Sequence, residues 1–335
     1  MKRKVIFFSV LIVLVFLGLR LIGVLAVNPF CRNRMEKPEG ALRVMTFNMN
    51  ALEGDGYVPF SKDSLLSVLM QVEPDVLCLQ ELSPKLYDTI SDVLDSVFRY
   101  TEPFGRYNVI CSRLPLSNPG RYRAYGDVDT TGYSNSDHLT LKDVKGSMPV
   151  CSADVTCLDG SVITVLGCHL SSCGYSSIRR AMAEDASWFS GVPEYAREYG
   201  IARRLRAFEA DNLRPVLDSL LQLPGTASGS GAAPGSGVDA GTASGGTSGA
   251  GGRRVIIAGD FNDFSRSYCL RRIQGDDLTD AWSARGNGFG FTYDGWHLRL
   301  RLDHILYSPG LTPRNVIVLD TCLSDHRALI ADFAL

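Results

Sequence analysis

Short apolar runs alternate with longer amphipathic stretches from residue 42 to the C-terminus. The runs are rich in valine, isoleucine and leucine, which is typical of strands buried on at least one face. In the longer stretches apolar residues recur every three or four positions, which predicts helices with one buried face. We expect strands at residues 42–47, 76–79, 109–111, 150–156, 162–166, 255–258, 304–307 and 328–333, and helices at residues 61–71, 86–97 and 195–221.

Strands and helices that alternate in this way predict an α/β fold. Two packed sheets with helices on their outer faces, a four-layer α/β/β/α sandwich, accommodate the expected elements. The pattern does not fix the order of the strands within the sheets.

Residues 5–27 are apolar except for Ser9 and Arg20. About 20 such residues cross the hydrocarbon core of a bilayer, so the segment predicts a single-pass transmembrane helix. Basic residues precede it, and the positive-inside rule therefore places residues 1–4 in the cytoplasm and the catalytic part on the non-cytoplasmic side of the membrane. Residues 28–41 then form a tether. A cleaved signal peptide is the alternative, although the apolar run exceeds the roughly 7 to 15 residues usual for one.

A glycine- and serine-rich segment at about residues 223–252 has almost nothing to bury and predicts a disordered insertion. It could separate two domains. The segments before and after it continue the same strand and helix pattern, however, and a long loop adds little closure entropy. We therefore expect one catalytic domain over residues 42–335, with the insertion as a surface loop.

Composition narrows the classes of function. A chain of 335 residues with 45% hydrophobic content buries a sizeable core, which excludes disorder of the whole chain. The formal net charge of -2 argues against tight, nonspecific binding to nucleic-acid phosphates. The nine cysteines include no C-x-x-C pair and no zinc-type spacing, and Cys78, Cys111 and Cys168 are expected to be inert core thiols.

Polar residues suited to metal binding or acid–base chemistry stand at the ends of five expected strands. They are Asn48, Glu81, His169, Asp260 with Asn262, and Asp325 with His326. Each has a structural alternative, such as a turn residue, an exposed helix start or a hydrogen-bonded histidine. Their recurrence favours one shared cleft, where carboxylate and amide oxygens suit a hard cation such as Mg²⁺.

These motifs resemble the endonuclease/exonuclease/phosphatase superfamily, which includes DNase I-like nucleases, inositol-polyphosphate phosphatases and bacterial sphingomyelinases. The resemblance runs from about Arg43 to Leu335, interrupted by the insertion, and implies the DNase I-like four-layer sandwich. The motifs are Thr46-Phe47-Asn48, Pro74-Asp75-Val76 with Gln80-Glu81, Ile110-Cys111-Ser112-Arg113, His169-Leu170, Gly259-Asp260-Phe261-Asn262, Leu302-Asp303-His304-Ile305-Leu306 and Ser324-Asp325-His326.

The resemblance implies that Glu81 is the principal metal-binding carboxylate and that Asn48 lies beside it at the metal. Asp325 is implied as a further metal contact, and Asn108 and Arg113 as substrate-binding residues. The expected cation is Mg²⁺, with Mn²⁺ as the alternative, since both prefer oxygen ligands.

The same resemblance implies that His326 is the general base and that Asp303 orients it. Asp260 is implied to position or activate the attacking water, Asn262 to steady the phosphate and His169 to donate to a nonbridging oxygen. A metal and an imidazolium would stabilise the negative charge that builds up as water attacks.

The sequence departs from the family pattern at two positions. Gly167-Cys168 precedes His169, and Tyr107 replaces the glycine that usually precedes the Asn108 motif. Neither change removes a catalytic group.

The expected function is divalent-metal-dependent hydrolysis of phosphate esters by a catalytic domain that is monomeric. Nucleic acid is one expected substrate, with the predicted helix arginines Arg203, Arg204 and Arg206, and Arg179 and Arg180 before them, either contacting phosphates or forming a solvated face. A phospholipid or phosphoinositide-type headgroup is the alternative that the membrane anchor favours. A noncatalytic binding domain is the third hypothesis. Substrate choice is expected to depend on loops at residues 120–145 and 171–199, which include Tyr133, Asp137, His138 and Trp188.

Overall fold

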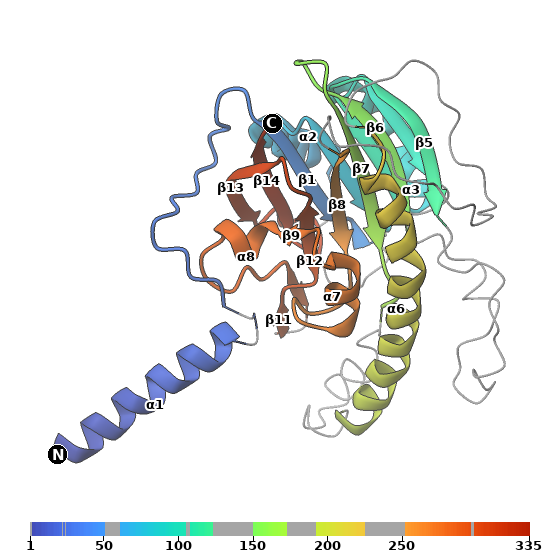
Figure 1. The fold of residues 1–335 in the computed structure, drawn as a ribbon. Helices are drawn as coiled ribbons and strands as arrows, with labels where there is room; N and C mark the ends of the chain where they lie inside the picture. Colours follow the sequence, from blue (N-terminus) through green and yellow to red (C-terminus); the bar gives the residue numbers. More distant parts are fainter. Residues whose placement is uncertain are drawn as a thin grey trace.

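The computed structural model describes residues 2–21, 23, 25–50, 61–104, 108–122, 150–172, 192–224, 252–295 and 298–335. Figure 1 shows the arrangement of its helices and strands. In chain order they are α1 (Lys2–Leu21), β1 (Leu42–Asn48), α2 (Lys62–Val72), β2 (Val76–Gln80), α3 (Pro84–Val97), β3 (Tyr100–Phe104), β4 (Asn108–Ser112), β5 (Leu116–Tyr122), β6 (Val150–Thr156), β7 (Val162–His169), α6 (Val192–Leu221), β8 (Arg254–Asp260), α7 (Tyr268–Gln274), β9 (Thr279–Asp280), α8 (Ala281–Arg285), β10 (Tyr293–Gly295), β11 (Leu298–Leu300), β12 (Asp303–Tyr307), β13 (Thr312–Leu319) and β14 (Ala328–Ala334).

Two mixed sheets form the centre of the molecule. One six-stranded sheet has the order β13-β14-β1-β2-β4-β3, and the other has the order β5-β6-β7-β8-β12-β9. β1 and β2 run parallel in the first sheet, and β7 and β8 run parallel in the second. Each pair therefore delivers its C-terminal residues to one edge of its sheet.

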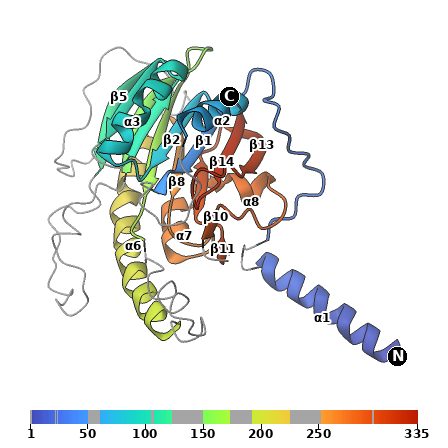
Figure 2. The same ribbon diagram turned by 180° about the vertical axis from the view of Figure 1, so that it is seen from behind.

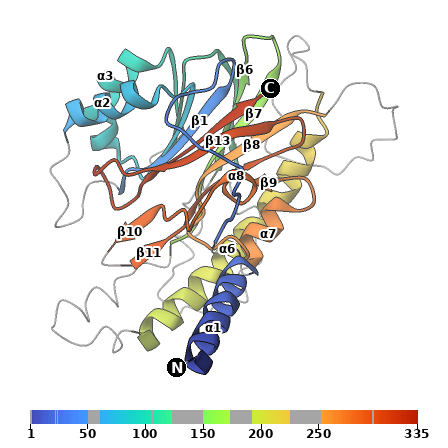
Figure 3. The same ribbon diagram turned by 90° about the vertical axis from the view of Figure 1, so that its left-hand side faces the viewer.

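Three separate hydrophobic clusters divide the molecule into four layers. The cluster between the sheets includes Val44 of the first and Val165 of the second. Along β1 the side chains alternate, so Met45 points the other way, into a cluster that also contains residues of α2 and α3. The third cluster joins the second sheet to α6 and α7. The resulting order is α2/α3, sheet, sheet, α6/α7, and Figure 3 shows the two helix layers on opposite sides of the strands.

All eight expected strands and all three expected helices are present. Seen from behind, α2 and α3 cover the outer face of the first sheet (Figure 2). The α/β prediction with two packed, helix-covered sheets is therefore confirmed. Cys78, Cys111 and Cys168, which were expected to be core thiols, are free and buried.

The apolar N-terminal segment differs from its prediction. The helix ends at Leu21 instead of continuing to residue 27, because Gly23 adopts a φ of +74° and Ala26 forms a bridge with Gly288. Within the described ranges, no helix combines the length and the apolarity that crossing a bilayer requires.

The tether, residues 28–41, lies against the catalytic domain (Figure 1). The backbone N–H of Asn28 donates to Oδ1 of Asn287 at 2.6 Å, and Nδ2 of Asn33 donates to the carbonyl of Arg285 at 3.0 Å. Further along, Nζ of Lys37 pairs with Asp75 at 2.6 Å. The chain that follows α1 is therefore attached to the domain at several points.

The glycine- and serine-rich insertion lies almost wholly outside the described residues. Its two ends, Pro224 and Gly252, form a bridge with each other. The elements on either side, α6 and β8, pack into the same hydrophobic cluster. This arrangement fits an insertion within one domain.

Candidate active site

The register of the strands places most of the predicted residues at the ends of central strands, on one side of the two sheets. Asn48 at the end of β1 pairs with Gln80 at the end of β2, so Glu81 follows immediately. In the second sheet, His169 at the end of β7 pairs with Asp260 at the end of β8. The antiparallel strand β12 begins at the same edge, because Asp303 pairs with Asp260.

Glycine makes the close approach of β7 and β8 feasible. A Cβ at Gly259 would lie 1.8 Å from the carbonyl oxygen of Cys168. This explains the first position of the Gly259-Asp260-Phe261-Asn262 motif, since any side chain there would separate the strands that carry His169 and Asp260.

Asn48 connects the two sheets. Its Nδ2 donates to Oε1 of Glu81 at 3.1 Å in its own sheet and to Oδ2 of Asp260 at 2.9 Å in the other. Its Oδ1 accepts the backbone N–H of Asn50 at 2.8 Å. The amide nitrogen of Asn48, rather than its oxygen, thus faces Glu81 and orients that carboxylate.

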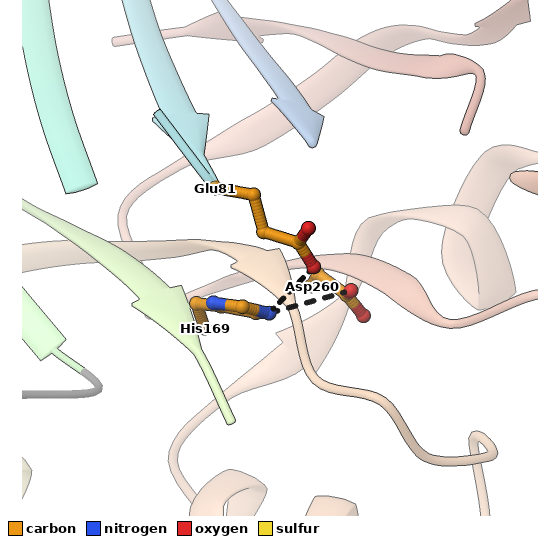
Figure 4. Close-up of side chains that lie close together, drawn as sticks. All are labelled: Glu81, His169 and Asp260. Atoms are coloured by element: carbon orange, nitrogen blue, oxygen red, sulfur yellow. Dashed lines mark ion pairs between the residues drawn. The ribbon is translucent and has the colours of Figure 1, made fainter. Parts of the chain in front are cut away.

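Glu81, His169 and Asp260 point toward one another (Figure 4). Nε2 of His169 lies 3.3 Å from Oε1 of Glu81 and 3.9 Å from Oδ2 of Asp260. Glu81 adopts a φ of +55°, which is uncommon for a residue with a side chain. Such strain is often found at functional sites, where the surrounding structure holds it in place.

His326 and Asp303 form a second, buried pair. Nδ1 of His326 lies 2.8 Å from Oδ2 of Asp303, while Nε2 faces Oδ2 of Asp260 at 3.7 Å. The imidazole also packs edge to face against Tyr293, with ring centroids 5.2 Å apart. One ring nitrogen is therefore occupied by a carboxylate, and the other points into the cluster.

Asn262 fixes the orientation of Asp260. Its backbone N–H donates to Oδ1 of Asp260 at 2.8 Å, and its Nδ2 donates to Oδ2 at 3.1 Å. The same Nδ2 donates to the carbonyl of Leu170 at 2.9 Å, which ties the loop after β8 to the end of β7. Asn262 too has a positive φ, of +52°.

The acids of the cluster have pKa values that are shifted in different directions. Burial opposes ionisation of Glu81, but the imidazole of His169 at 3.3 Å, a hydrogen bond from Asn48 and the charge of His326 outweigh it and lower the pKa of Glu81 to about 2. Burial raises the pKa of Asp260 to about 6, despite the opposing charge of His326. Burial likewise raises the pKa of Asp325 above its ordinary value.

The two imidazoles have raised pKa values for a shared reason. Burial disfavours the cation in each ring, but neighbouring carboxylates outweigh this effect. Asp303 and Asp260 raise the pKa of His326 to about 10, and Glu81 raises the pKa of His169 above its ordinary value. The site therefore stabilises positive charge.

The donor set fits a divalent cation. Ligand atoms of Glu81, His169 and Asp260 all lie within 4.8 Å of one another, and so do those of Asp260, Asp303 and His326. Glu81 stays ionised across neutral pH because its pKa is about 2. Oδ1 of Asp303 is buried without a hydrogen-bond partner among the described residues. Each set contains two carboxylates and one imidazole, and the carboxylate oxygens suit Mg²⁺ and Mn²⁺, which prefer oxygen ligands.

The predicted substrate-binding residues, Asn108 and Arg113, lie at opposite ends of β4. Val109 pairs with Leu79, so Asn108 is near the end of β2 that carries Glu81. Arg113 instead donates its backbone N–H to the carbonyl of Asp75, before β2 begins. The structure does not bring Arg113 to the cluster, because a strand rises about 3.3 Å per residue and its ends are far apart.

The arginines considered for nucleic-acid contact fall into different environments. Arg206 is fully buried, with Nε 3.3 Å from Oδ2 of Asp263, and so does not belong to a solvated face. Arg203 and Arg204 are exposed on α6. Arg179 and Arg180 lie outside the described residues, as do the loop residues Tyr133, Asp137, His138 and Trp188.

One supporting residue has no signal in the sequence. The buried Thr292 accepts the backbone N–H groups of Leu302 and Asp303 at 3.1 and 3.0 Å through its Oγ1. Its carbonyl accepts the backbone N–H of Arg327 at 2.6 Å. Thr292 therefore joins the start of β12, which carries Asp303, to the residue that follows His326.

Comparisons with solved structures show the same fold at low sequence identity. A humanised TDP2 from D. rerio has a TM-score of 0.54 and 18% identity, covering 89% of this chain and 100% of that one. The human Nocturnin catalytic domain with bound sulfate has a TM-score of 0.53 and 18% identity, covering 89% and 96%. A solved endonuclease/exonuclease/phosphatase from Beutenbergia cavernae DSM 12333 has a TM-score of 0.51 and 17% identity, covering 89% of this chain and 72% of that one. No curated protein sequence matches the chain.

A family model described as "Endonuclease/Exonuclease/phosphatase family" matches residues 45–326, a span that begins in β1 and ends at His326. This span includes Asn48, Glu81 and the paired ends of β7 and β8. The chain therefore belongs to the endonuclease/exonuclease/phosphatase family and is a phosphoesterase of the hydrolase class.

Proposed function

We propose that the protein hydrolyses phosphodiesters by attack of water, with His326 as the general base and a divalent cation, Mg²⁺ or Mn²⁺, held by Glu81 and Asp325. The observation that carries the proposal is the position of His326. Nδ1 contacts Asp303 at 2.8 Å, so in the neutral ring Nε2 is the atom that accepts a proton, on the side of Asp260. The neighbouring carboxylates raise the pKa of this ring to about 10, and the positive charge of a bound cation would lower it. A base of this kind contributes when it lies within hydrogen-bond reach of the proton that it removes.

The protein groups divide the reaction between them. The attacking water, positioned by Asp260, transfers a proton to Nε2 of His326 as its oxygen bonds to phosphorus. Asp303 holds the imidazole in one tautomer and stabilises the imidazolium that forms. His169 donates to a nonbridging oxygen, and Asn262, whose Nδ2 donates to Leu170 and Asp260, supports the reaction by holding Asp260 in place. The bond from phosphorus to the leaving oxygen breaks, that oxygen takes a proton from solvent, and His326 releases the proton it received to solvent.

A bound divalent cation supplies positive charge that polarises a phosphoryl oxygen and lowers the pKa of a nearby imidazole. Glu81 is suited to hold it because its carboxylate is ionised and oriented by Asn48. Asp325, next to His326, would supply a second carboxylate, because the charge of Glu81 is among the causes that raise its pKa and the two acids therefore lie near each other.

The decisive experiment measures turnover of bis(p-nitrophenyl) phosphate and p-nitrophenyl phosphate with Mg²⁺, Mn²⁺ or EDTA. We expect metal-dependent hydrolysis of the diester and its loss in His326→Ala. Retained hydrolysis in that variant would exclude His326 as the base. Binding of the diester without turnover, unchanged in the variant, would favour a noncatalytic domain.

The proposed hydrolysis applies to two classes of substrate, nucleic acid and phospholipid. Nucleic acid is supported by the solved D. rerio TDP2, whose structure contains a single-stranded DNA product. A phospholipid headgroup is supported by the side on which α1 leaves the domain, because the ends of β7 and β8 point toward that side (Figure 1). Single-stranded DNA, RNA and mixed lipid micelles compared at equal phosphate concentration distinguish the classes.

We also propose that residues 5–27 attach the protein to a membrane, with the catalytic domain on the non-cytoplasmic side and monomeric. Large apolar side chains of α1 support attachment, since Phe7 is 65%, Ile12 67% and Leu14 60% exposed. Contiguous exposed apolar surface of this kind marks a contact with lipid or protein. Fractionation of cells that express the full chain tests the membrane, and protease accessibility of the domain tests its side.

A further inference from the structure

Arginines surround a cavity beside the C-terminal end of α1. The cavity has a volume of about 1080 Å³ and lies between α6, α7 and the last residue of α1, Leu21. Its lining arginines are Arg203, Arg204, Arg266 and Arg271. A second cavity of about 410 Å³ shares Arg266 and Arg271 with the first and adds Arg20 from α1. We call these five side chains the arginine cluster.

The two carboxylates that line these cavities, Asp211 and Asp280, accept hydrogen bonds from groups outside this cluster. In the larger cavity, Asp211 accepts from Nε of Arg272 at 2.8 Å and from the hydroxyl of Tyr268 at 2.8 Å. In the smaller cavity, Asp280 accepts from Nη1 of Arg301 at 2.7 Å. Both acids are therefore engaged by groups outside the cluster.

Arg266 and Arg271 have no carboxylate of their own. Neither forms an ion pair with any residue in the described part of the chain, and both are exposed. The side chain of Arg266 lies against Gly23, where an added Cβ would be 2.9 Å from its Cγ. The charge is thus held beside the turn that ends α1.

Aromatic and apolar groups accompany the charge. Phe264, 37% exposed, and Tyr268, 49% exposed, line the larger cavity together with Leu21. Upstream, α1 exposes large apolar side chains along its length, including Ile12 and Leu14. Aromatic residues next to an apolar helix are typical of the interface between membrane and water, and basic residues there attract anionic headgroups.

We propose that the arginine cluster binds the headgroups of anionic phospholipids and so holds the active-site side of the domain against a lipid surface. The apolar side chains of α1 and Leu21 supply contact with acyl chains, and the arginines supply contact with phosphate. The Asn262–Phe264 turn links the two regions, because Asn262 holds Asp260 whereas Phe264 lines the cavity. The proposal concerns binding and does not depend on which ester is cleaved.

The test uses the full chain purified in uncharged detergent and titrated with micelles of the same detergent that contain phosphatidylglycerol or phosphatidylcholine. We expect saturable binding of phosphatidylglycerol and at least tenfold weaker binding of phosphatidylcholine. Arg266→Glu with Arg271→Glu should weaken phosphatidylglycerol binding at least tenfold, since each basic residue near an anionic surface contributes about a fivefold effect.

A matched double variant, Arg99→Glu with Arg314→Glu, makes the same change in net charge. Both arginines are exposed: Arg99 directly precedes β3, and Arg314 lies in β13. It should change phosphatidylglycerol binding less than threefold. Equal loss in both double variants would overturn the proposal, because it would mean that only net charge matters. Equal binding of the two lipids would overturn it as well.

Further measurements distinguish the binding of lipid from the binding of other anions. Inorganic phosphate that displaces phosphatidylglycerol at low millimolar concentration would indicate a free-phosphate site. A 12-nucleotide DNA that loses binding in the Arg266/Arg271 variant while the lipid does not would indicate nucleic acid. Either result overturns a lipid surface. A far-ultraviolet circular dichroism spectrum like that of the unsubstituted protein shows that the two double variants fold. If the glutamate variant does not fold, Arg266→Gln with Arg271→Gln replaces it.

Discussion

Nδ1 of His326 lies 2.8 Å from Oδ2 of Asp303, and the two residues come from different sheets. Asp303 begins β12 in the second sheet, whereas His326 precedes β14 in the first. The proposed base is therefore assembled only when the two sheets pack against each other. The proposed chemistry therefore depends directly on the stability of the sandwich.

Asp303→Asn is expected to lower kcat for a diester by about 10³- to 10⁴-fold, because an amide does not hold the imidazole in the reactive tautomer. The unfolding temperature should also fall, because the amide leaves the buried imidazole of His326 without this carboxylate, so kcat is measured per folded molecule. Asp276→Asn, a change of an exposed acid, is the control. Near-normal kcat in Asp303→Asn would show that the reaction does not use this pair.

Glu81→Gln is expected to raise the Mg²⁺ concentration for half-maximal activity by roughly 100-fold or more, because even residues that only support a ligand contribute 10- to 100-fold to metal affinity. Calorimetric titration with Mn²⁺ gives the same quantity without turnover. Glu39→Gln, at an exposed position of the tether, should leave both values unchanged. Unaltered Mn²⁺ affinity in Glu81→Gln would place the cation elsewhere.

Thr292→Val is expected to lower kcat by about tenfold to 100-fold with little change in KM, because it removes the acceptor for the N–H of Asp303 without touching a substrate-binding group. Thr292→Ser keeps the hydroxyl and should restore kcat. A purely structural role predicts instead that stability falls and that kcat per folded molecule stays constant.

Much of this arrangement could be predicted because the strands that carry chemistry are central ones. β1, β2, β7 and β8 are buried along almost their whole length and mostly apolar, so their runs end sharply at Asn48, Glu81, His169 and Asp260. Edge strands lack this signal. β5 contains Pro119 and Gly120 and is largely exposed, and residues of that type are tolerated only at sheet edges or bulges.

Contacts between distant segments could not be predicted from local pattern. The role of Thr292 arises from hydrogen bonds to β12 and to Arg327, which no spacing in the sequence reports. Arg113 illustrates the opposite error, because a motif that is continuous in sequence extends along β4 to the far end of the sheet. The predicted helix of residues 5–27 was too long because Ala26 pairs with Gly288, far along the chain.

The buried carboxylate of Asp280 should make stability depend on pH. Burial opposes its ionisation, but the charge of Arg301 and contacts with His304 outweigh it, so its pKa is lowered well below 3.8. The unfolded chain binds a proton near pH 3.8, whereas the folded protein does not, and the ionised group therefore stabilises the fold above that pH and loses this effect as the pH falls. Breaking such a buried pair costs about 3 kcal/mol.

Asp280→Asn should thus lower the free energy of unfolding by about 3 kcal/mol at pH 6.5. The difference from the unsubstituted protein should narrow by about 1 kcal/mol at pH 3, where the unfolded carboxylate is mostly protonated. Urea denaturation at both pH values measures it, with Asp276→Asn as the control. A difference in the free energy of unfolding that stayed constant, or that widened in acid, would mean that the fold does not stabilise Asp280 as an anion. Arg301 would then be held in place by its other contacts, such as its hydrogen bond to the carbonyl of Gly23.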